Sequence, residues 1–408
     1  MPILASTNRI QISYKAEVTP GTPVTATPGN LLRITGESLN YDLKKESDKE
    51  IRSDRQRTSS TTVGATVGGG INVHMQYGEF DPLLSALMQS AWAPVATDGA
   101  FSGAAIYATT STITATATLP APGLLLQGQW IQLTNPLTNA GLPQLVRISA
   151  IAAAPTASLI TLDVSTPITV AASGTISIKA ARLSNGTTLK SFTIEMSIGG
   201  IAVPVFQTFR GMYVSKFSTT FNSGAMTDAN FEFMGLTMAS GTATLLNASP
   251  AASLGYDVQN AVTGVGNIWE NGVPLTSTSI KSFSLNIDNA LRSQDAIGTL
   301  GSVGVGVGTL SVSGSMEIYF ADGSLYNKFL ADTYTSLLVS TKDTAGNGYV
   351  FTFPKVMLTS AKTDAGGKDA DLMASFNWEA YADTANAVVA LQKTLFIDRF
   401  GAAVTLPT

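Results

Sequence analysis

The feature that most constrains the fold of this chain is an alternation of apolar and polar residues with a period of two. Residues 8–15, NRIQISYK, place Ile10, Ile12 and Tyr14 on one side of an extended segment. Residues 68–77 follow the same pattern, with one face made of Ile71, Val73, Met75 and Tyr77. This period is typical of half-buried β-strands, and clusters of Pro, Gly and Asn separate such runs along the chain. We therefore expect a mainly β fold.

A strongly charged window lies between two of these runs, and we expect it to be the tip of a long hairpin. Eleven charged residues fall between Asp42 and Arg57, about a fifth of the 52 in the chain. From residue 44 onward the positive residues are Lys44, Lys45, Lys49, Arg52, Arg55 and Arg57, and the negative ones are Glu46, Asp48, Glu50 and Asp54. Interspersed signs favour pairing with a complementary protein surface over binding DNA, for which one sign dominates. We predict that these ten residues form a contact between subunits, with a solvated loop as the alternative.

A change of period after residue 78 predicts a short helix. In EFDPLLSALMQSAW, residues 79–92, Asp81 can cap a helix whose first residue is Pro82, where the missing N–H has no cost. The apolar residues have the spacing of one buried helix face: Leu83, Leu84, Leu87, Met88 and Ala91. The expected helix spans 82–92.

Residues 97–182 differ in composition from the rest and carry almost no charge. They contain five alternating runs separated by turn residues: TTSTITATATL, GQWIQLT, QLVRISAI, SLITLDV and GTISIKAA. Short strands at regular spacing are typical of a small antiparallel sandwich or barrel. We therefore predict an all-β module inserted between residues 1–96 and 183–408, which together would form the main domain.

Residues 280–338 repeat the order of elements expected for residues 32–92. IKSFSLNIDNA at 280–290 leads through a Gly-rich run into the strand pattern TLSVSGSMEIYF, a turn, and a second short helix pattern, LYNKFLADTYTSLL. Leu325, Phe329 and Leu330 have the same apolar spacing as the first helix. A duplicated β-plus-helix unit suggests pseudo-symmetry within the chain, a feature of ring-building proteins.

Composition argues against several classes of function. The chain has 408 residues, a net charge of −4, no cysteine and a single histidine, His74. Without cysteine there is no disulfide framework and no thiolate metal site, and the acidic balance gives no general attraction for nucleic acid. His74 alternates to the face opposite Ile71, which favours a sheet-surface histidine over a catalytic one. We expect no enzymatic activity, no cofactor and no metal.

Other segments that could bind ligands are better explained as turns and strands. The Gly-rich run at 301–308 leads into a strand, whereas a phosphate loop leads into a helix, so a strand tip or a contact between subunits is favoured. DTAGNG, from Asp343, and TDAGGKDAD, at 363–371, lack the carboxylate spacing of a calcium loop. The N-terminal residues lack a secretory signal pattern, and no apolar run reaches the length of about eighteen residues that spans a membrane.

Two groups of segments resemble the tail tube proteins of long, non-contractile-tailed bacteriophages. The first is FRGMYVSKFSTTFNSGAMTDANFEFMG at 209–235, preceded by KSFTIEMSIGG at 190–200. The second is GESLNYDLKKESDKEIRSDRQ at 36–56, followed by a Gly-Gly strand and FDPLLSAL at 80–87. Their order along one chain carries the resemblance, and residues 97–182 resemble the variable β insert that such proteins often contain.

The resemblance implies a ring-forming β-sandwich or barrel with a long hairpin loop, a short flanking helix and usually six subunits per ring. It also implies partners: rings that stack around a tape-measure protein, tail terminator and tail-tip proteins, and DNA that passes through the lumen without sequence-specific binding. Assembly in the host cytoplasm and a final place in the virion tail follow from it. The ten charged residues of the window would then contact the next ring.

The rival class is a β-rich phage or surface adhesin, such as a receptor-binding fibre. The all-β module and the abundance of Ser and Thr would suit it. The internal duplication and the long charged hairpin favour polymerisation instead, because paired strand edges close a ring and stacked contacts extend it.

Overall fold

The computed structural model confirms the mainly β fold, with a large network of strands, a separate seven-stranded sheet and a small hairpin. The structure describes residues 5–24, 28–93, 101–102, 106–108, 112–115, 128–134, 144–153, 158–162, 177–179, 181–246, 249–262, 264–265, 268–275, 279–365, 367–386 and 389–401. Two short α-helices lie within these ranges.

The elements follow one another along the chain with these bounds. The helical elements are η1 (Thr7–Arg9), α1 (Asp81–Leu87), α2 (Ser324–Leu330) and η3 (Val389–Leu391). The strands up to the end of the module are β1 (Ile10–Ala16), β2 (Asn30–Leu32), β3 (Gly36–Glu37), β4 (Asn40–Ser47), β5 (Ser60–His74), β6 (Phe101–Ser102), β7 (Ile106–Ala108), β8 (Thr112–Ala115), β9 (Trp130–Thr134), β10 (Gln144–Ala153), β11 (Ser158–Leu162) and β12 (Ser177–Lys179). The later strands are β13 (Ala181–Ser184), β14 (Phe192–Ile198), β15 (Val205–Asn222), β16 (Asp228–Gly235), β17 (Thr237–Gly241), β18 (Trp269–Glu270), β19 (Val273–Pro274), β20 (Ile280–Asp288), β21 (Arg292–Asp295), β22 (Ser302–Gly306), β23 (Ser311–Tyr319), β24 (Thr335–Lys342), β25 (Gly348–Ala365), β26 (Leu372–Tyr381) and β27 (Phe396–Phe400).

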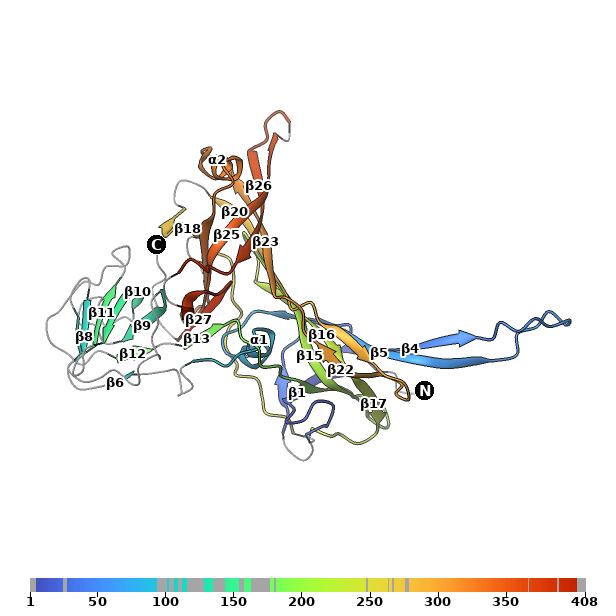
Figure 1. Cartoon of the computed structure of the whole chain (residues 1–408). Helices are drawn as coiled ribbons and strands as arrows, with labels where there is room; N and C mark the ends of the chain where they lie inside the picture. The colour runs from blue at the N-terminus through green and yellow to red at the C-terminus, as the bar shows by residue number, and fades with distance from the viewer. Residues whose placement is uncertain are drawn as a thin grey trace.

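An antiparallel sheet of eight strands runs through the molecule, in the order β4-β5-β16-β15-β20-β23-β26-β25. In Figure 1 it extends from the β25–β26 hairpin at the top to the β4–β5 hairpin at the right. The short strand β3 continues the line of β4 along β5. All neighbouring strands in this sheet are antiparallel, and several of them are consecutive in the chain and form hairpins.

The same strand order occurs twice in this sheet. In the first set of four strands, β5 lies between β4 and β16, and β16 pairs with β15. In the second set, β23 lies between β20 and β26, and β26 pairs with β25. A short helix follows the second strand of each set, and α1 contacts β15 as α2 contacts β25. We call each set a four-strand unit, and the two units meet where β15 pairs with β20.

The strands β15 and β25 each belong to two sheets. Both contain 18 residues. The first half of β15 pairs with β14 and β17, and the first half of β25 pairs with β24 and β27. Each strand has a register shift against its neighbour, between Val214 and Lys216 in β15 and between Leu358 and Ser360 in β25. A bulge of this kind bends a strand, which lets one chain segment leave one sheet and enter another.

The core lies on one face of the eight-stranded sheet. Its largest fully buried side chains include Phe217, Phe231, Phe283, Phe376 and Trp378. Phe283 and Trp378 stack with ring centroids 5.4 Å apart. Burying such a side chain stabilises the fold by roughly 1.5–3 kcal/mol, and the period-two pattern places all of them on the same face.

The expected first helix is present, but it is shorter than predicted. It spans Asp81–Leu87, and the structure buries its expected apolar residues Leu83, Leu84, Leu87 and Met88. The prediction is wrong for Ala91, which lies beyond the helix end and is exposed.

Asp81 was expected to cap this helix, and that prediction is also wrong. The N-cap residue is Phe80, and no side chain caps the helix. The Asp81 carboxylate instead accepts a hydrogen bond from the Tyr349 hydroxyl, at 2.7 Å, and pairs with Arg399. Because these partners lie more than 260 residues away along the chain, the local pattern gave no sign of them.

A second sheet, of seven strands, lies within the segment that was expected to be an inserted module. Its strand order is β6-β12-β9-β10-β11-β8-β7, and each of the five predicted runs contains one of these strands. Trp130 of β9 packs against Trp269 of β18 in an edge-to-face pair, with centroids 6.0 Å apart. Residue 97, the expected start of the module, lies outside the described residues, and the domain boundaries stay a prediction.

Candidate assembly surfaces

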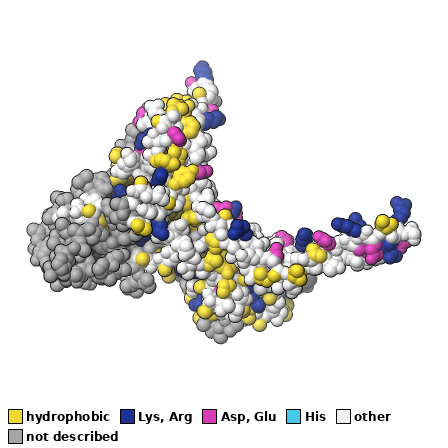
Figure 2. Space-filling model, in the orientation of Figure 1, with side chains coloured by type: hydrophobic (Ala, Val, Ile, Leu, Met, Phe, Trp, Pro, Cys, Tyr) yellow, Lys and Arg dark blue, Asp and Glu magenta, His cyan; other side chains and the backbone are white. Residues whose placement is uncertain are grey.

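The charged window forms the end of a long hairpin, which we call the charged arm: β4, β5 and the connection 48–59. Its strands pair from Asn40 opposite Gly68 to Ser47 opposite Ser60. Figure 1 shows the arm projecting far from the rest of the chain, and Figure 2 shows positive and negative side chains along it. The strand-like runs on both sides of the window were the signal that predicted this hairpin.

Nearly all of the arm's end is exposed. Of the ten predicted contact residues, Asp48 is partly buried and the other nine are exposed. Three apolar side chains are exposed beside them: Leu43 at 44%, Val63 at 49% and Ile51, at the tip, at 103%.

Five of the ten predicted contact residues have partners inside the arm. Arg52 donates two hydrogen bonds to Asp54, at 3.0 and 2.8 Å. Lys44 lies 3.9 Å from Glu46. Asp48 accepts hydrogen bonds from the backbone and side chains of Thr58 and Ser59, and these bonds lower the pKa of its carboxyl. These residues therefore help to shape the arm.

The other five are Lys45, Lys49, Glu50, Arg55 and Arg57. Their side chains make no ion pair or hydrogen bond with any residue that the structure describes. Four of the five are positive. From the sequence, the ten charged residues could only be described as one set of mixed sign. Because five of them have partners inside the arm, the charges left for a partner protein are mostly positive.

A second surface is the face of the eight-stranded sheet opposite the core. It is covered by hydroxyl and amide side chains that lie opposite one another across neighbouring strands. Asn230 donates to Asn72 at 2.6 Å, and the hydroxyls of Ser284 and Ser315 are 2.8 Å apart. One line of paired residues across six strands reads Asn72, Asn230, Ser218, Asn286, Ser313 and Glu379. We call this surface the polar sheet face.

Acidic groups outnumber basic groups on the polar sheet face. Its carboxylates include Asp228, Glu232, Asp288, Glu317 and Glu379. Lys216 lies 3.2 Å from Asp288, and Lys281 lies 3.4 Å from Glu317. His74 lies 2.7 Å from Asp228, which agrees with the expected sheet-surface histidine. The alternation in each strand could have located this face, but only the strand pairing shows that the polar residues join into one surface.

A buried ion pair lies where the module meets the main sheet network. Arg182 donates two hydrogen bonds of 2.8 Å to Asp398, and both side chains are almost fully buried. Burial raises the pKa of Asp398, and the adjacent guanidinium of Arg182 acts in the opposite direction. Arg182 also lies over the ring of Phe396, 4.4 Å from its centroid.

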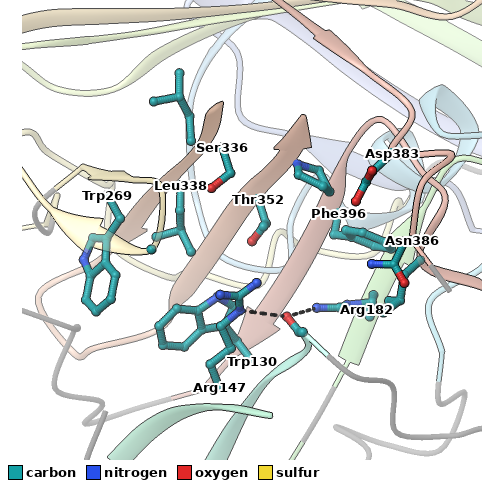
Figure 3. Close-up of a pocket in the computed structure, with 15 residues that line it drawn as sticks. Trp130, Arg147, Arg182, Trp269, Ser336, Leu338, Thr352, Asp383, Asn386 and Phe396 are labelled. Atoms are coloured by element: carbon teal, nitrogen blue, oxygen red, sulfur yellow. Dashed lines mark hydrogen bonds between the residues drawn. The ribbon is translucent and has the colours of Figure 1, made fainter. Parts of the chain in front are cut away.

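A cavity of about 200 Å³ adjoins this ion pair. Figure 3 shows Trp130, Trp269 and Leu338 on one side, and Arg182, Phe396 and Asn386 on the other. Arg147 and Arg182 both donate to the carbonyl of Gly128. The arrangement joins the module and the main sheet network through charge and aromatic packing.

Two of the segments considered for ligands contain a strand and a turn. The run 301–308 contains β22, which pairs with β21 in a hairpin. Asp343 accepts hydrogen bonds from the backbone and side chain of Asn347 within a turn. Across the described ranges, no three His, Asp or Glu residues gather in a way that could hold a metal ion. The helices in those ranges are too short or too polar to cross a membrane.

Comparison with known proteins agrees with the β-rich fold. Residues 7–380 match the family model described as phage tail tube protein. No curated protein matches the chain. The match covers both four-strand units and the segment between them. The chain belongs to the phage tail tube protein family.

Proposed function

We propose that this protein closes into rings and that the rings stack into the tail tube through which DNA passes into the host. As a member of the family it is a structural component of the virion tail that assembles with other tail proteins. The proposal adds that assembly takes place in the host cytoplasm and that the tube surrounds a tape-measure protein and ends at terminator and tail-tip proteins.

The observation that carries the conduit role is the polar sheet face. A lumen that conducts DNA needs a surface without positive excess, because basic side chains bind phosphates and would slow the DNA. Hydroxyls, amides and excess carboxylates meet that need, and two of the lysines there lie beside carboxylates. We therefore infer that this face lines the lumen and that the core faces outward.

The number of chains per ring depends on whether one chain or one four-strand unit takes the place of a subunit. The resemblance implies six subunits, and a chain with two four-strand units supplies two of them. We therefore propose that six units close the ring, which takes three chains rather than six. Mass photometry of purified rings separates the two counts, because each chain has a mass of 42.4 kDa.

The conduit role is tested by reversing charge on the polar sheet face. Wild-type tubes are expected to leave duplex DNA unbound, whereas tubes of Glu232→Lys/Glu379→Lys are expected to retain it in a salt-dependent way. Electron microscopy first establishes that both proteins form tubes, and isolated fibres in the wild-type sample would favour the adhesin alternative. Tight DNA binding by wild-type tubes would contradict the proposal.

We further propose that the charged arm contacts the next ring. Replacing Arg52 and Arg55 with Glu would test the contact predicted for the ten charged residues, but Arg52 already pairs with Asp54. The sharper variant is Arg55→Glu/Arg57→Glu, with Arg55→Lys/Arg57→Lys as the matched control that keeps the charge. The reversal is expected to leave single rings that do not stack, while circular dichroism stays unchanged. Tubes of normal length from the reversed variant would refute the role of the arm.

A further inference from the structure

The two four-strand units are equivalent residue by residue along their first strands. The strand pairings place Ser38, Leu39, Asn40 and Asp42 at the positions of Ser284, Leu285, Asn286 and Asp288. The sequence Ser-Leu-Asn-X-Asp therefore occurs at the same place in both units. Equivalent segments of this kind can be expected to make equivalent contacts along their edges.

Side-chain contacts support this equivalence. The hydroxyl of Ser38 accepts a hydrogen bond from the backbone N–H of Gly70, at 2.9 Å. The hydroxyl of Ser284 accepts one from the N–H of Ser315, also at 2.9 Å.

Backbone packing next to these hydrogen bonds is also the same. A Cβ added to Gly69 would lie 2.2 Å from the Ser38 carbonyl oxygen, and one added to Gly314 would lie 2.0 Å from that of Ser284. Each unit therefore needs glycine where its first two strands approach most closely.

The two four-strand units pair with each other at the centre of the eight-stranded sheet, but the equivalent strands at the two edges of the sheet have no such partner. The second half of β15 pairs with β20, from Lys216 opposite Asp288 to Asn222 opposite Ser282. The equivalent half of β25, residues 360–365, pairs only with β26 among the described strands. The segment 36–42, equivalent to β20, pairs only with β5 among those strands. The sheet therefore has two bare edges that match the two sides of an existing pairing.

Equivalent apolar side chains are less buried in the first unit, where the strand that would pair with 36–42 is missing. Leu285 and Ile287 of β20 are 0% and 1% exposed. Their equivalents, Leu39 and Tyr41, are only partly buried, although both pack against the core. A strand added along 36–42 would cover these two side chains as β15 covers β20.

We propose that residues 360–365 of one chain pair with residues 36–42 of a second copy, in the register of the internal β15–β20 contact. This inference rests on the proposed ring and names the strands that close it. The register follows from the equivalence: Ser360 lies opposite Asp42, Lys362 opposite Asn40, and Asp364 opposite Ser38. The contact between two chains then has the same geometry as the β15–β20 pairing within each chain.

The charges along the two edges fit this register. In the internal junction Lys216 lies directly opposite Asp288, 3.2 Å away. Between chains the lysine is Lys362, which pairs with Asp364 of its own strand, at 3.0 Å, and would lie opposite Asn40 and diagonal to Asp42 of the second copy. A diagonal neighbour across a strand pair is within reach of a long side chain. An attractive cross-strand contact is therefore kept, with the lysine moved by two residues along its strand.

The absence of cysteine makes the register directly measurable, because any disulfide reports only introduced residues. The variant Asn40→Cys/Lys362→Cys is oxidised after tube assembly and run on a denaturing gel. The matched geometry within one chain is Ser218→Cys/Asn286→Cys, which is expected to close a disulfide without changing the mass. The control with shifted register is Asp42→Cys/Asp364→Cys, whose residues would lie about 13 Å apart along the strands.

The expected result is a ladder of covalent oligomers from Asn40→Cys/Lys362→Cys and at least a tenfold weaker ladder from the shifted control. A mixture of the two single variants gives covalent dimers, which shows that the bond joins different chains. Tubes without a ladder, or a stronger ladder from the shifted control, would overturn the inference while leaving the tube itself intact. Failure of the wild-type chain to form rings or tubes would instead overturn the proposed function.

Discussion

Removing Asp398 should destabilise the protein far more than removing an exposed carboxylate. In the native structure the side chains of Arg182 and Asp398 are 4% and 1% exposed. Asp398→Ala would leave the guanidinium buried without its counter-charge, which typically costs about 3–5 kcal/mol of folding free energy. The matched control is Asp364→Ala, whose pair with Lys362 is 73% and 59% exposed and whose loss is expected to cost about 0–1 kcal/mol.

Urea unfolding measures this difference, followed by tryptophan fluorescence because Trp130 and Trp269 line the adjacent cavity. The double variant Arg182→Met/Asp398→Leu removes both charges and is expected to recover most of the lost stability, since an apolar pair of similar size needs no desolvated ions. A loss below about 1 kcal/mol for Asp398→Ala, or a double variant no more stable than the single one, would refute the reasoning.

Three further outcomes follow from single buried groups. Tyr349→Phe removes the hydroxyl that donates to Asp81 and should cost about 1.5–3 kcal/mol in urea unfolding; an unchanged midpoint would contradict it. Gly314→Ala places a Cβ 2.0 Å from a carbonyl of β20 and should cost about 1–3 kcal/mol, whereas Gly241→Ala, with open space around it, should cost far less. Burial raises the pKa of Tyr14 to about 12, so the native state keeps a proton that the unfolded chain loses above about pH 10. Stability should therefore fall as pH rises from about 10 to 12, and Tyr14→Phe should remove that part of the dependence; an identical pH profile for the variant would count against it.

Local patterns were enough to predict the elements but not their partners. The alternation around Ile71 and the turns between runs predicted strands, because a period of two reports only which side of a strand is apolar. The helix was predicted from the spacing of Leu83 and Leu87, which lie on one helical face. Asp81 shows where this reasoning ends, since its partners Tyr349 and Arg399 are distant in sequence.

The charged window likewise shows that the sequence predicts a local element but not the contacts of its side chains. Its place between two strand-like runs predicted the hairpin, and the structure confirms it. Its charges were treated as equivalent because the sequence gives their order but not their contacts. The fold separates Arg52, which bonds Asp54, from Arg55, which has no ion-pair partner within the described residues.

The sequence by itself determined that this chain forms amphipathic strands, a long hairpin and short helices, and its segments pointed to the phage tail tube family. These properties depend on neighbours within a few residues, which the linear order states directly. Only the tertiary structure decided which polar residues join into one face and which strand edges are left bare. The reason is that strand pairing brings together segments such as β5 and β16, whose paired residues His74 and Asp228 are 154 positions apart. A bare edge is visible only once all such pairings are in place.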